Sequence, residues 1–471
     1  MMHARKRVVS RLAATAVATG LIAGGALAAA APAVADELNP RSGGATAVLD
    51  GLEVSGKVDV TQNGRTEAIN GGLFSLTAED GGTLKTYCID FGTPAQSGAQ
   101  YKETGWESST LHENPDAGKI HWILQNSYPV VNDLDGLAEQ AGAESLNDEQ
   151  AAAGTQAAIW ELSDGVEAVP QDEDAALLAE WLLANAADVA EPGASLELNP
   201  PQVSGQPGQV IGPVTVSSSA ESVFVAPDAS AAEQGVTIVD VNGEYITEDQ
   251  PVADGTELYF SVPEDAADGQ ASLTATATSQ VPVGRALTGI DTRTQTMILA
   301  GSSDSSVTAG ATVSWAAPGQ PAVAINAVEK CTEGGVEITA SNEGDVPFTF
   351  ELDGESYEVG PGESQPVVVP VENGQAYEIT IANDMDPAKP WQFTGVLDCA
   401  TGDDGGPEPV EDNEPSPATT GGGEGDDGAD LAETGSSGGN PALIGGIAVA
   451  LLAVGGGVVL FIRRRASAAG E

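Results

Sequence analysis

An uncharged apolar stretch near the C-terminus constrains this chain more than any other feature. It runs from Ala442 to Ile462 and is followed at once by the arginines 463–465. About twenty apolar residues suffice to cross a bilayer as a helix, and arginines behind such a helix stay on the cytoplasmic side. We therefore expect one transmembrane helix over residues 442–462, with the rest of the chain folding outside the membrane.

The N-terminal segment, residues 1–35, is typical of a secretory signal peptide. Basic residues such as Arg5 and Arg7 precede an apolar run, which ends in the small-residue site Ala33-Val34-Ala35. Cleavage is expected between Ala35 and Asp36. The mature chain would then fold in an oxidising compartment, where disulfides form.

Acidic residues greatly outnumber basic residues in this chain. There are 70 Asp and Glu against 17 Lys and Arg, for a formal net charge of −53. Nucleic-acid binding needs a clustered basic surface, so this class of function is excluded. Residues 401–430 are rich in acids, Gly and Pro and contain no Lys or Arg. This composition predicts a disordered acidic spacer.

The chain contains three cysteines, so one free thiol remains if the other two form a disulfide. Cys331 and Cys399 lie near the two ends of a strand-rich segment, residues 321–400, which is broken by Asp-Gly and Asn-Gly turns. This pattern predicts a small immunoglobulin-like β-sandwich. A Cys331–Cys399 disulfide would stabilise it by on the order of 4 kcal/mol in the chain-entropy model. Cys88 is then the cysteine without a partner.

Residues 196–320 predict a second β-sandwich of the immunoglobulin-like kind. Alternating runs occur, for example, at residues 257–262, 271–278 and 292–299. No lysine lies between Lys119 and Lys330, which excludes a Lys–Asn isopeptide bond in this module. The sequence does not exclude a Thr–Gln ester cross-link in this module.

Cys88 lies in the stretch Tyr87-Cys88-Ile89-Asp90, at the expected end of a strand. A helix is expected to begin after Asn147, whose capping-box partner is Gln150, and to end at Gly165. At i, i+3, i+4 and i+7 spacing, one face of this helix carries Gln156, Ile159, Trp160 and Ser163. The amide of Gln156 is therefore expected to face an apolar interface.

These two elements resemble the thioester domains of Gram-positive surface proteins. That family carries a Tyr-Cys element and a later Thr-Gln-x-Ala-apolar-Trp element, which residues 87–90 and 155–160 match, and residues 101–106 look like a stretch of actinobacterial members. The resemblance covers roughly residues 45–195, and we assign residues 36–195 to a β-sandwich thioester domain with a helical insertion. It implies that the Cys88 sulfur attacks the Gln156 side-chain carbonyl, releases ammonia and leaves an internal thioester.

The resemblance also implies a function. An amine on another surface, such as a protein lysine, would attack the Gln156 carbonyl and become joined by an amide, which releases Cys88. The event occurs once, so we expect a covalent adhesin rather than an enzyme, with no cofactor. The bond must be kept away from water. The residues expected to shield it are Tyr87, Trp106, Thr155, Ile159 and Trp160.

A pentapeptide before the apolar stretch resembles the cell-wall sorting signal of Gram-positive bacteria, in the form common in actinobacteria. It consists of Leu431, Ala432, Glu433, Thr434 and Gly435. The resemblance implies that a sortase cuts between Thr434 and Gly435 and joins Thr434 to cell-wall peptide. Residues 431–471 would then form the sorting signal, with a transient helix, and the mature protein would be secreted and anchored to the wall.

Other interpretations stay open. The protein could keep its membrane span, or it could be a structural wall protein whose head is inert and whose Cys88 is a buried thiol. Cys88 with His121 would be the minimum for a hydrolase or transamidase, but no nucleophile motif surrounds Cys88, and we expect His121 to be a packed helix residue. Asp-rich turns such as that at Asp164 lack the spaced ligands of a calcium loop, so no metal site is predicted.

Overall fold

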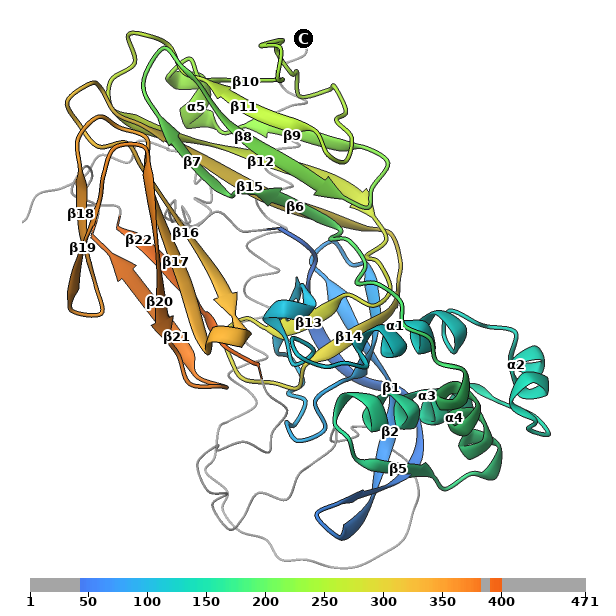
Figure 1. The fold of residues 1–471 in the computed structure, drawn as a ribbon. Helices are drawn as coiled ribbons and strands as arrows, with labels where there is room; N and C mark the ends of the chain where they lie inside the picture. Colours follow the sequence, from blue (N-terminus) through green and yellow to red (C-terminus); the bar gives the residue numbers. More distant parts are fainter. Residues whose placement is uncertain (1–42, 383–389, 400–471) are drawn as a thin grey trace, which may run out of the picture. The chain divides into compact units, whose positions relative to one another are not determined.

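The computed structural model describes residues 43–382 and 390–399, whose elements Figure 1 shows. The fold is mainly β, which confirms the prediction from alternation. Within these residues, no helix is both long enough and apolar enough to cross a membrane. The predicted signal peptide, acidic spacer, sorting signal and transmembrane helix all lie outside the described residues.

The N-terminal part is built on a seven-stranded sheet. In spatial order its strands are β2 (Arg65–Ala78), β3 (Thr83–Cys88), β14 (Met297–Ser302), β13 (Ala286–Gly289), β4 (Gln100–Thr104), β1 (Thr46–Gln62) and β5 (Glu167–Pro170). The strands β1 and β2 form a long antiparallel hairpin. Its turn uses Asn63 and Gly64, whose φ angles of 52° and 76° suit a tight hairpin turn.

Two strands of this sheet come from far along the chain. The strands β13 and β14 lie within residues 196–320, which the alternation predicts to be a separate sandwich. In the structure β14 pairs with β3 and β13 pairs with β4, so the two close the gap between strands of the N-terminal part. They also cover edges that would otherwise expose unpaired backbone groups. The sheet therefore crosses the boundary predicted at residue 195, because alternation identifies a strand but not its partner.

Four helices accompany the sheet: α1 (Ala117–Asn126), α2 (Leu134–Ala141), α3 (Asp148–Ser163) and α4 (Glu173–Asn185). The helix α3 begins with the predicted capping box of Asn147 and Gln150, and Gly165 follows its C-cap with a φ of 65°. Its residues 151–160 are buried without a break, because α3 packs on β1 and β2 and also on α4. Gly154 permits the close approach of α4, since a Cβ there would lie 2.6 Å from the carbonyl oxygen of Ala175.

The middle part is a sandwich of two four-stranded sheets. One sheet has the order β10 (Thr237–Val239), β11 (Glu257–Ser261), β8 (Val210–Ser218) and β6 (Leu196–Asn199). The other has the order β7 (Gln202–Gly205), β15 (Ser305–Trp315), β12 (Gly269–Ser279) and β9 (Val223–Pro227), and the short helix α5 (Ala229–Glu233) packs on β12. Burial alternates along β12 from residue 271 to residue 278, as the pattern predicts.

The C-terminal module contains three small antiparallel groups of strands. They are β16 (Val323–Lys330), β17 (Gly335–Asn342) and β20 (Glu363–Pro370); β18 (Phe348–Leu352) and β19 (Glu355–Val359); and β21 (Ala376–Ile381) and β22 (Trp391–Val396). Aromatic side chains such as Phe348 and Trp391 fill its core. The disulfide between Cys331 and Cys399 closes the module across 68 residues.

A buried ion pair fixes the returning strands on the N-terminal sheet. The Nε of Arg285 donates to Oε1 of Glu103 at 2.9 Å, and its Nη1 donates to Oε1 of Glu191 at 2.9 Å. Glu103 also accepts from the backbone N–H groups of Ala45 at 3.0 Å and of Ser195 at 2.9 Å. Arg285 is 7% exposed and Glu103 6%. The pair thus ties β4, the start of β13 and the linker before β6 together.

Replacing Arg285 is expected to destabilise the fold strongly. Arg285→Ala leaves the Glu103 carboxylate buried without its cation, which should lower the free energy of unfolding by about 3 kcal/mol or more. Urea denaturation measures this change. Lys330→Ala, which removes an exposed ion pair with Glu107, is the control and should cost less than about 1 kcal/mol. Equal effects of the two variants would contradict the assigned role of Arg285.

Candidate functional site

Cys88 is the last residue of β3, at the point where this strand leaves β2. The β2–β3 pairing ends with Phe74 opposite Thr86, whereas Cys88 still lies opposite Met297 of β14. The next backbone N–H, that of Ile89, donates to the carbonyl of Thr296 on the β14 side at 3.1 Å. Backbone groups of successive residues alternate in direction, so the N–H and C=O of Cys88 face the β2 side, beyond the end of that ladder.

The side-chain amide of Gln156 pairs with Cys88 where the pairing of β2 with β3 has ended. The backbone N–H of Cys88 donates to Oε1 of Gln156 at 3.0 Å, and Nε2 of Gln156 donates to the carbonyl oxygen of Cys88 at 2.9 Å. Both residues are fully buried. Gln156 stands in the middle of α3, so docking of this helix on the sheet brings the two residues together. The structure thus pairs the two residues that the motifs singled out.

The Cys88 sulfur lies in a dry and acidic environment. The backbone N–H of Asp90 donates to Sγ at 3.3 Å. Burial raises the pKa of the Cys88 thiol well above its usual value, and the negative charge of Asp164 raises it further, while the nearby Trp160 side chain acts in the opposite direction. Cys88 is therefore a protonated thiol at neutral pH in the described state.

Tyr87 and Thr155, both predicted to shield the site, are fully buried. The Tyr87 hydroxyl donates to the carbonyl of Tyr128 at 2.8 Å, and the Thr155 hydroxyl donates to the carbonyl of Ala151 at 2.7 Å. Burial raises the pKa of Tyr87, and the neighbouring Thr155 hydroxyl opposes this effect. The two side chains therefore meet between β3 and α3, where Thr155 immediately precedes Gln156.

Ile159 and Trp160 complete the apolar surroundings of the pair. Ile159 is fully buried, and Trp160 is only 3% exposed. The Trp160 ring packs edge to face on Phe91, with ring centroids 5.5 Å apart. Phe91 follows Cys88 by three residues, so this aromatic contact closes the space between α3 and the turn after β3.

Trp106 is the remaining residue that is predicted to shield the site. It begins the short 3-10 helix η1 (Trp106–Ser108), and its Nε1 donates to the carbonyl of Gly284 at 2.8 Å. Its ring meets His121 of α1 edge to face, at a centroid distance of 6.1 Å. These contacts join α1 to the segment before β13. A shielding role for Trp106 at Cys88 stays a prediction.

His121 is a buried residue of α1, as its apolar neighbours indicated. Its Nδ1 pairs with the carbonyl of Ala190 at 2.8 Å, and its Nε2 pairs with Nε2 of Gln125 at 2.9 Å. Burial lowers its pKa. Both ring nitrogens are thus engaged with groups other than Cys88.

Asp164 belongs to the site, although the sequence pattern did not assign it there. It is the C-cap of α3, and its Oδ1 accepts from the backbone N–H of Phe91 at 2.8 Å, while its Oδ2 lies 2.6 Å from the Ser163 hydroxyl. Burial raises the pKa of Asp164 to about 7, and the charge of Asp90 adds to this, against the hydrogen bonds from Ser163 and Phe91. The Gly165 signal located the helix end, but only the tertiary contact reveals what the C-cap carboxyl faces.

A second buried acid comes from the C-terminal module. Asp398 precedes the disulfide residue Cys399, and its Oδ2 accepts from the Thr296 hydroxyl at 3.2 Å. Burial raises the pKa of Asp398 to about 7, with Asp90 adding to the effect and Arg293 opposing it. Cys331 and Cys399 are joined, so Cys88 is the free cysteine of the chain. Because Asp398 accepts from Thr296, the module that this disulfide closes also contacts the segment that leads into β14.

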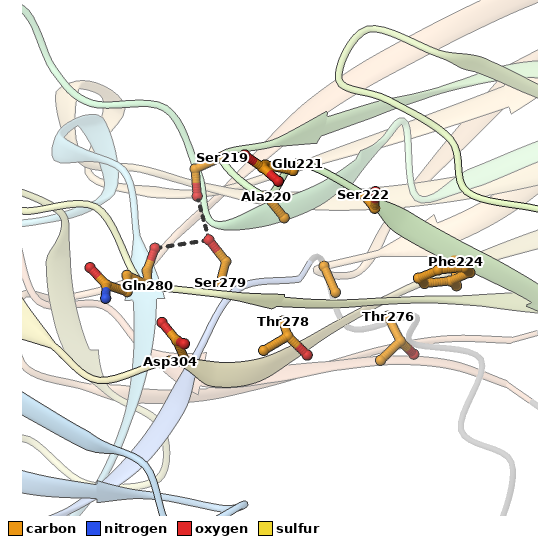
Figure 2. A pocket seen from close by; sticks show the side chains of 11 residues that line it. Ser219, Ala220, Glu221, Ser222, Phe224, Thr276, Thr278, Ser279, Gln280 and Asp304 are labelled. Atoms are coloured by element: carbon orange, nitrogen blue, oxygen red, sulfur yellow. Dashed lines mark hydrogen bonds between the residues drawn. The ribbon is translucent and has the colours of Figure 1, made fainter.

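A separate groove lies in the middle sandwich. Figure 2 shows it beside Phe224 and Thr276, with a hydrogen bond of 3.1 Å between Ser219 and Ser279, and its volume is about 780 Å³. Its lining contains no Cys, His or Lys. Within the part of the chain that the structure describes, no group of three or more His, Cys, Asp or Glu residues is placed to hold a metal ion. The covalent chemistry suggested by the motifs is thus centred on Cys88 rather than on this groove.

Comparison with known proteins identifies the class of the N-terminal domain. The family model of the thioester domain matches residues 85–188, a range that contains both Cys88 and Gln156. The chain therefore carries a thioester domain. No curated protein sequence matches the chain.

Two solved structures show partial similarity. The Bacillus anthracis TIE protein is 13% identical, and the match covers 76% of this chain and 81% of that protein with a TM-score of 0.26. The thioester domain of the Enterococcus faecium TIE86 protein is 17% identical, and the match covers 58% of this chain and 96% of that domain with a TM-score of 0.28. TM-scores this low carry no argument about the fold of this chain.

Gly71 of β2 lies where α3 packs on the sheet. A Cβ at this position would lie 3.0 Å from Cζ3 of Trp160 and 3.3 Å from Cγ of Gln156. Gly71→Ala is therefore expected to displace α3 and to lower the free energy of unfolding by about 1 to 3 kcal/mol, measured by urea denaturation. Gly193→Ala is the control, because a Cβ there meets no atom within 4 Å. Unchanged stability of the Gly71 variant would show that the site tolerates a wider spacing.

Proposed function

We propose that this chain is a secreted surface protein in which Cys88 and Gln156 form an internal thioester that captures amines covalently. The observation that carries the proposal is the reciprocal hydrogen bonding of the Gln156 amide with the Cys88 backbone in a fully buried interface. The match of residues 85–188 to the thioester domain supports the same chemistry.

Formation of the thioester needs only groups that the chain supplies. Sγ of Cys88 attacks Cδ of Gln156, the bond from Cδ to Nε2 breaks, and the thiol proton leaves with the nitrogen as ammonia. Negative charge develops on Oε1 during this step. The N–H of Cys88 already donates to that oxygen at 3.0 Å, so a donor is in place to stabilise the charge.

The thioester would then react with an amine. The amine nitrogen attacks Cδ of Gln156, the bond from Cδ to Sγ breaks, and a proton from the amine passes to Cys88, which becomes a thiol again. Gln156 ends as a stable amide, so each molecule reacts once, and we propose a covalent binder rather than an enzyme. A lysine on a protein of another surface carries a suitable amine, which makes adhesion the proposed role.

The proposed location rests on the terminal sequences. The signal peptide of residues 1–35 would direct export, and a sortase would join Thr434 to cell-wall peptide after cutting before Gly435. The acidic spacer of residues 401–430 would hold the folded part away from the anchor. The helix expected over residues 442–462 would be lost on anchoring.

The first test of the proposal is the mass of the secreted protein. The wild type is expected to be lighter than its sequence by one ammonia, in addition to the two hydrogens of the disulfide. Cys88→Ala and Gln156→Ala should each restore the ammonia. Gln140→Ala, at an exposed glutamine of α2, should keep the deficit. Intact-mass spectrometry at neutral pH measures all four proteins, and a wild type without the deficit would refute the thioester.

Methylamine tests reactivity in the same preparation. One methylamine should be added at Gln156, and one thiol should appear at Cys88, as located by peptide mapping and counted with a thiol reagent. Label at another residue, or repeated turnover, would favour the hydrolase or transamidase alternative.

Fractionation of the producing cells tests the anchor. Digestion of the wall with a muramidase is expected to release the protein ending at Thr434, whereas detergent alone should not release it. Thr434→Ala should shift the protein to the detergent-soluble membrane fraction, because the helix would then be retained. Wild-type protein that is soluble in detergent and still carries Arg463 would instead support a permanent membrane span.

A further inference from the structure

The hydroxyl of Ser163 has two possible acceptors and a single hydrogen. Its Oγ lies 3.0 Å from the carbonyl oxygen of Ile159 and 2.6 Å from Oδ2 of Asp164. A serine hydroxyl donates one hydrogen bond and accepts up to two. If Ser163 donates to Ile159, its short contact with Asp164 is a hydrogen bond only when the carboxyl group itself carries the proton.

A protonated Asp164 satisfies every polar group in this chain of contacts. Its O–H donates to Ser163, Ser163 donates to Ile159, and the backbone N–H of Phe91 donates to Oδ1 of Asp164 at 2.8 Å. An ionised Asp164 would have to take the hydrogen of Ser163 away from the Ile159 carbonyl. The geometry at the end of α3 therefore accommodates a neutral acid without loss of a hydrogen bond.

The charge of Asp164 acts on the Cys88 sulfur. After burial, it is the largest influence that raises the pKa of the Cys88 thiol. Asp90 of the turn after β3 is the other charged group that faces both Cys88 and Asp164, and it has the same sign. None of the groups that shift either pKa within the described residues is basic. A thiolate at Cys88 therefore meets repulsion whenever Asp164 is ionised.

We infer that Asp164 is a positioning residue that gates the proposed thioester: as a neutral acid it lets the Cys88 sulfur leave as a thiolate, and as a carboxylate it opposes this departure. The inference rests on the proposed function. It concerns the step in which an amine attacks Cδ of Gln156 and the bond to Sγ breaks. Because the pKa of Asp164 is raised to about 7, the change between the two states falls near neutral pH.

Asp164→Asn reproduces the neutral form. Its amide can accept from Phe91 and donate to Ser163, but it cannot ionise. In the wild type the folded protein holds this proton up to about pH 7, whereas the unfolded chain loses it near the ordinary Asp pKa of 3.8, so the wild type loses stability as the pH rises between these values. The Asn variant escapes this loss. At about pH 8 it should unfold at a temperature equal to or above that of the wild type.

The test measures the rate of thiol release by methylamine between about pH 5 and about pH 9. The ratio of the D164N rate to the wild-type rate cancels the protonation of methylamine, which both proteins share. The ratio should stay near one below the pKa of Asp164 and rise at least about tenfold above it, with a midpoint near pH 7. Amine uptake is confirmed at each pH by intact mass.

Asp398→Asn is the matched control. Asp398 is also buried with a pKa raised to about 7, but the charges that act on it are those of Asp90, Arg293 and Glu329. The D398N protein should therefore keep the wild-type pH dependence. A ratio of the D164N rate to the wild-type rate that stays constant with pH would overturn the gate. A ratio that falls at high pH would also overturn it, because it would show that ionised Asp164 assists the reaction as a proton acceptor. If the wild type takes up no methylamine at any pH, the proposed thioester itself fails, and the gate with it.

Discussion

The pairing of the Gln156 amide with the Cys88 backbone is the interaction on which the site depends. It satisfies a buried N–H and a buried C=O at the point where the β2 ladder has ended. Leaving either group unpaired would cost about 1 to 3 kcal/mol. The pairing also determines where α3 must lie on the sheet. The same contact that stabilises the fold thus holds a carbonyl group beside the Cys88 thiol.

This arrangement needs support from distant parts of the chain. The strand β14 lies on the other side of Cys88, with Met297 opposite it, and the middle sandwich is formed by residues before and after the two returning strands. The buried pair of Arg285 with Glu103 fixes the start of that return. The N-terminal sheet is therefore complete only when the chain up to residue 302 has folded.

Some acidic residues of the chain also act locally, near Cys88. In the part of the chain that the structure describes, most acids are exposed and contribute to solubility, but Asp90 is buried and Asp164 is half-buried next to the apolar surroundings of Cys88, and Asp398 is buried against Thr296. Burial shifts the pKa of Asp164 and of Asp398 to about 7. A dry environment of this kind both protects a reactive bond from water and makes its reactivity sensitive to a single nearby charge.

Local signals determined a large part of this structure. Alternation predicted a mainly β fold, and Asn147, Gln150 and Gly165 located α3, because capping and turn preferences act over a few residues. The resemblance of residues 87–90 and 155–160 to the motifs of thioester domains also implied that Cys88 and Gln156 form a pair. Only the tertiary structure showed that β13 and β14 join the N-terminal sheet and that Trp106 packs against His121. It alone brought Asp164 to the turn after Cys88. Strand partners and the environment of a buried carboxyl depend on contacts between residues far apart in the sequence, and no local preference encodes them.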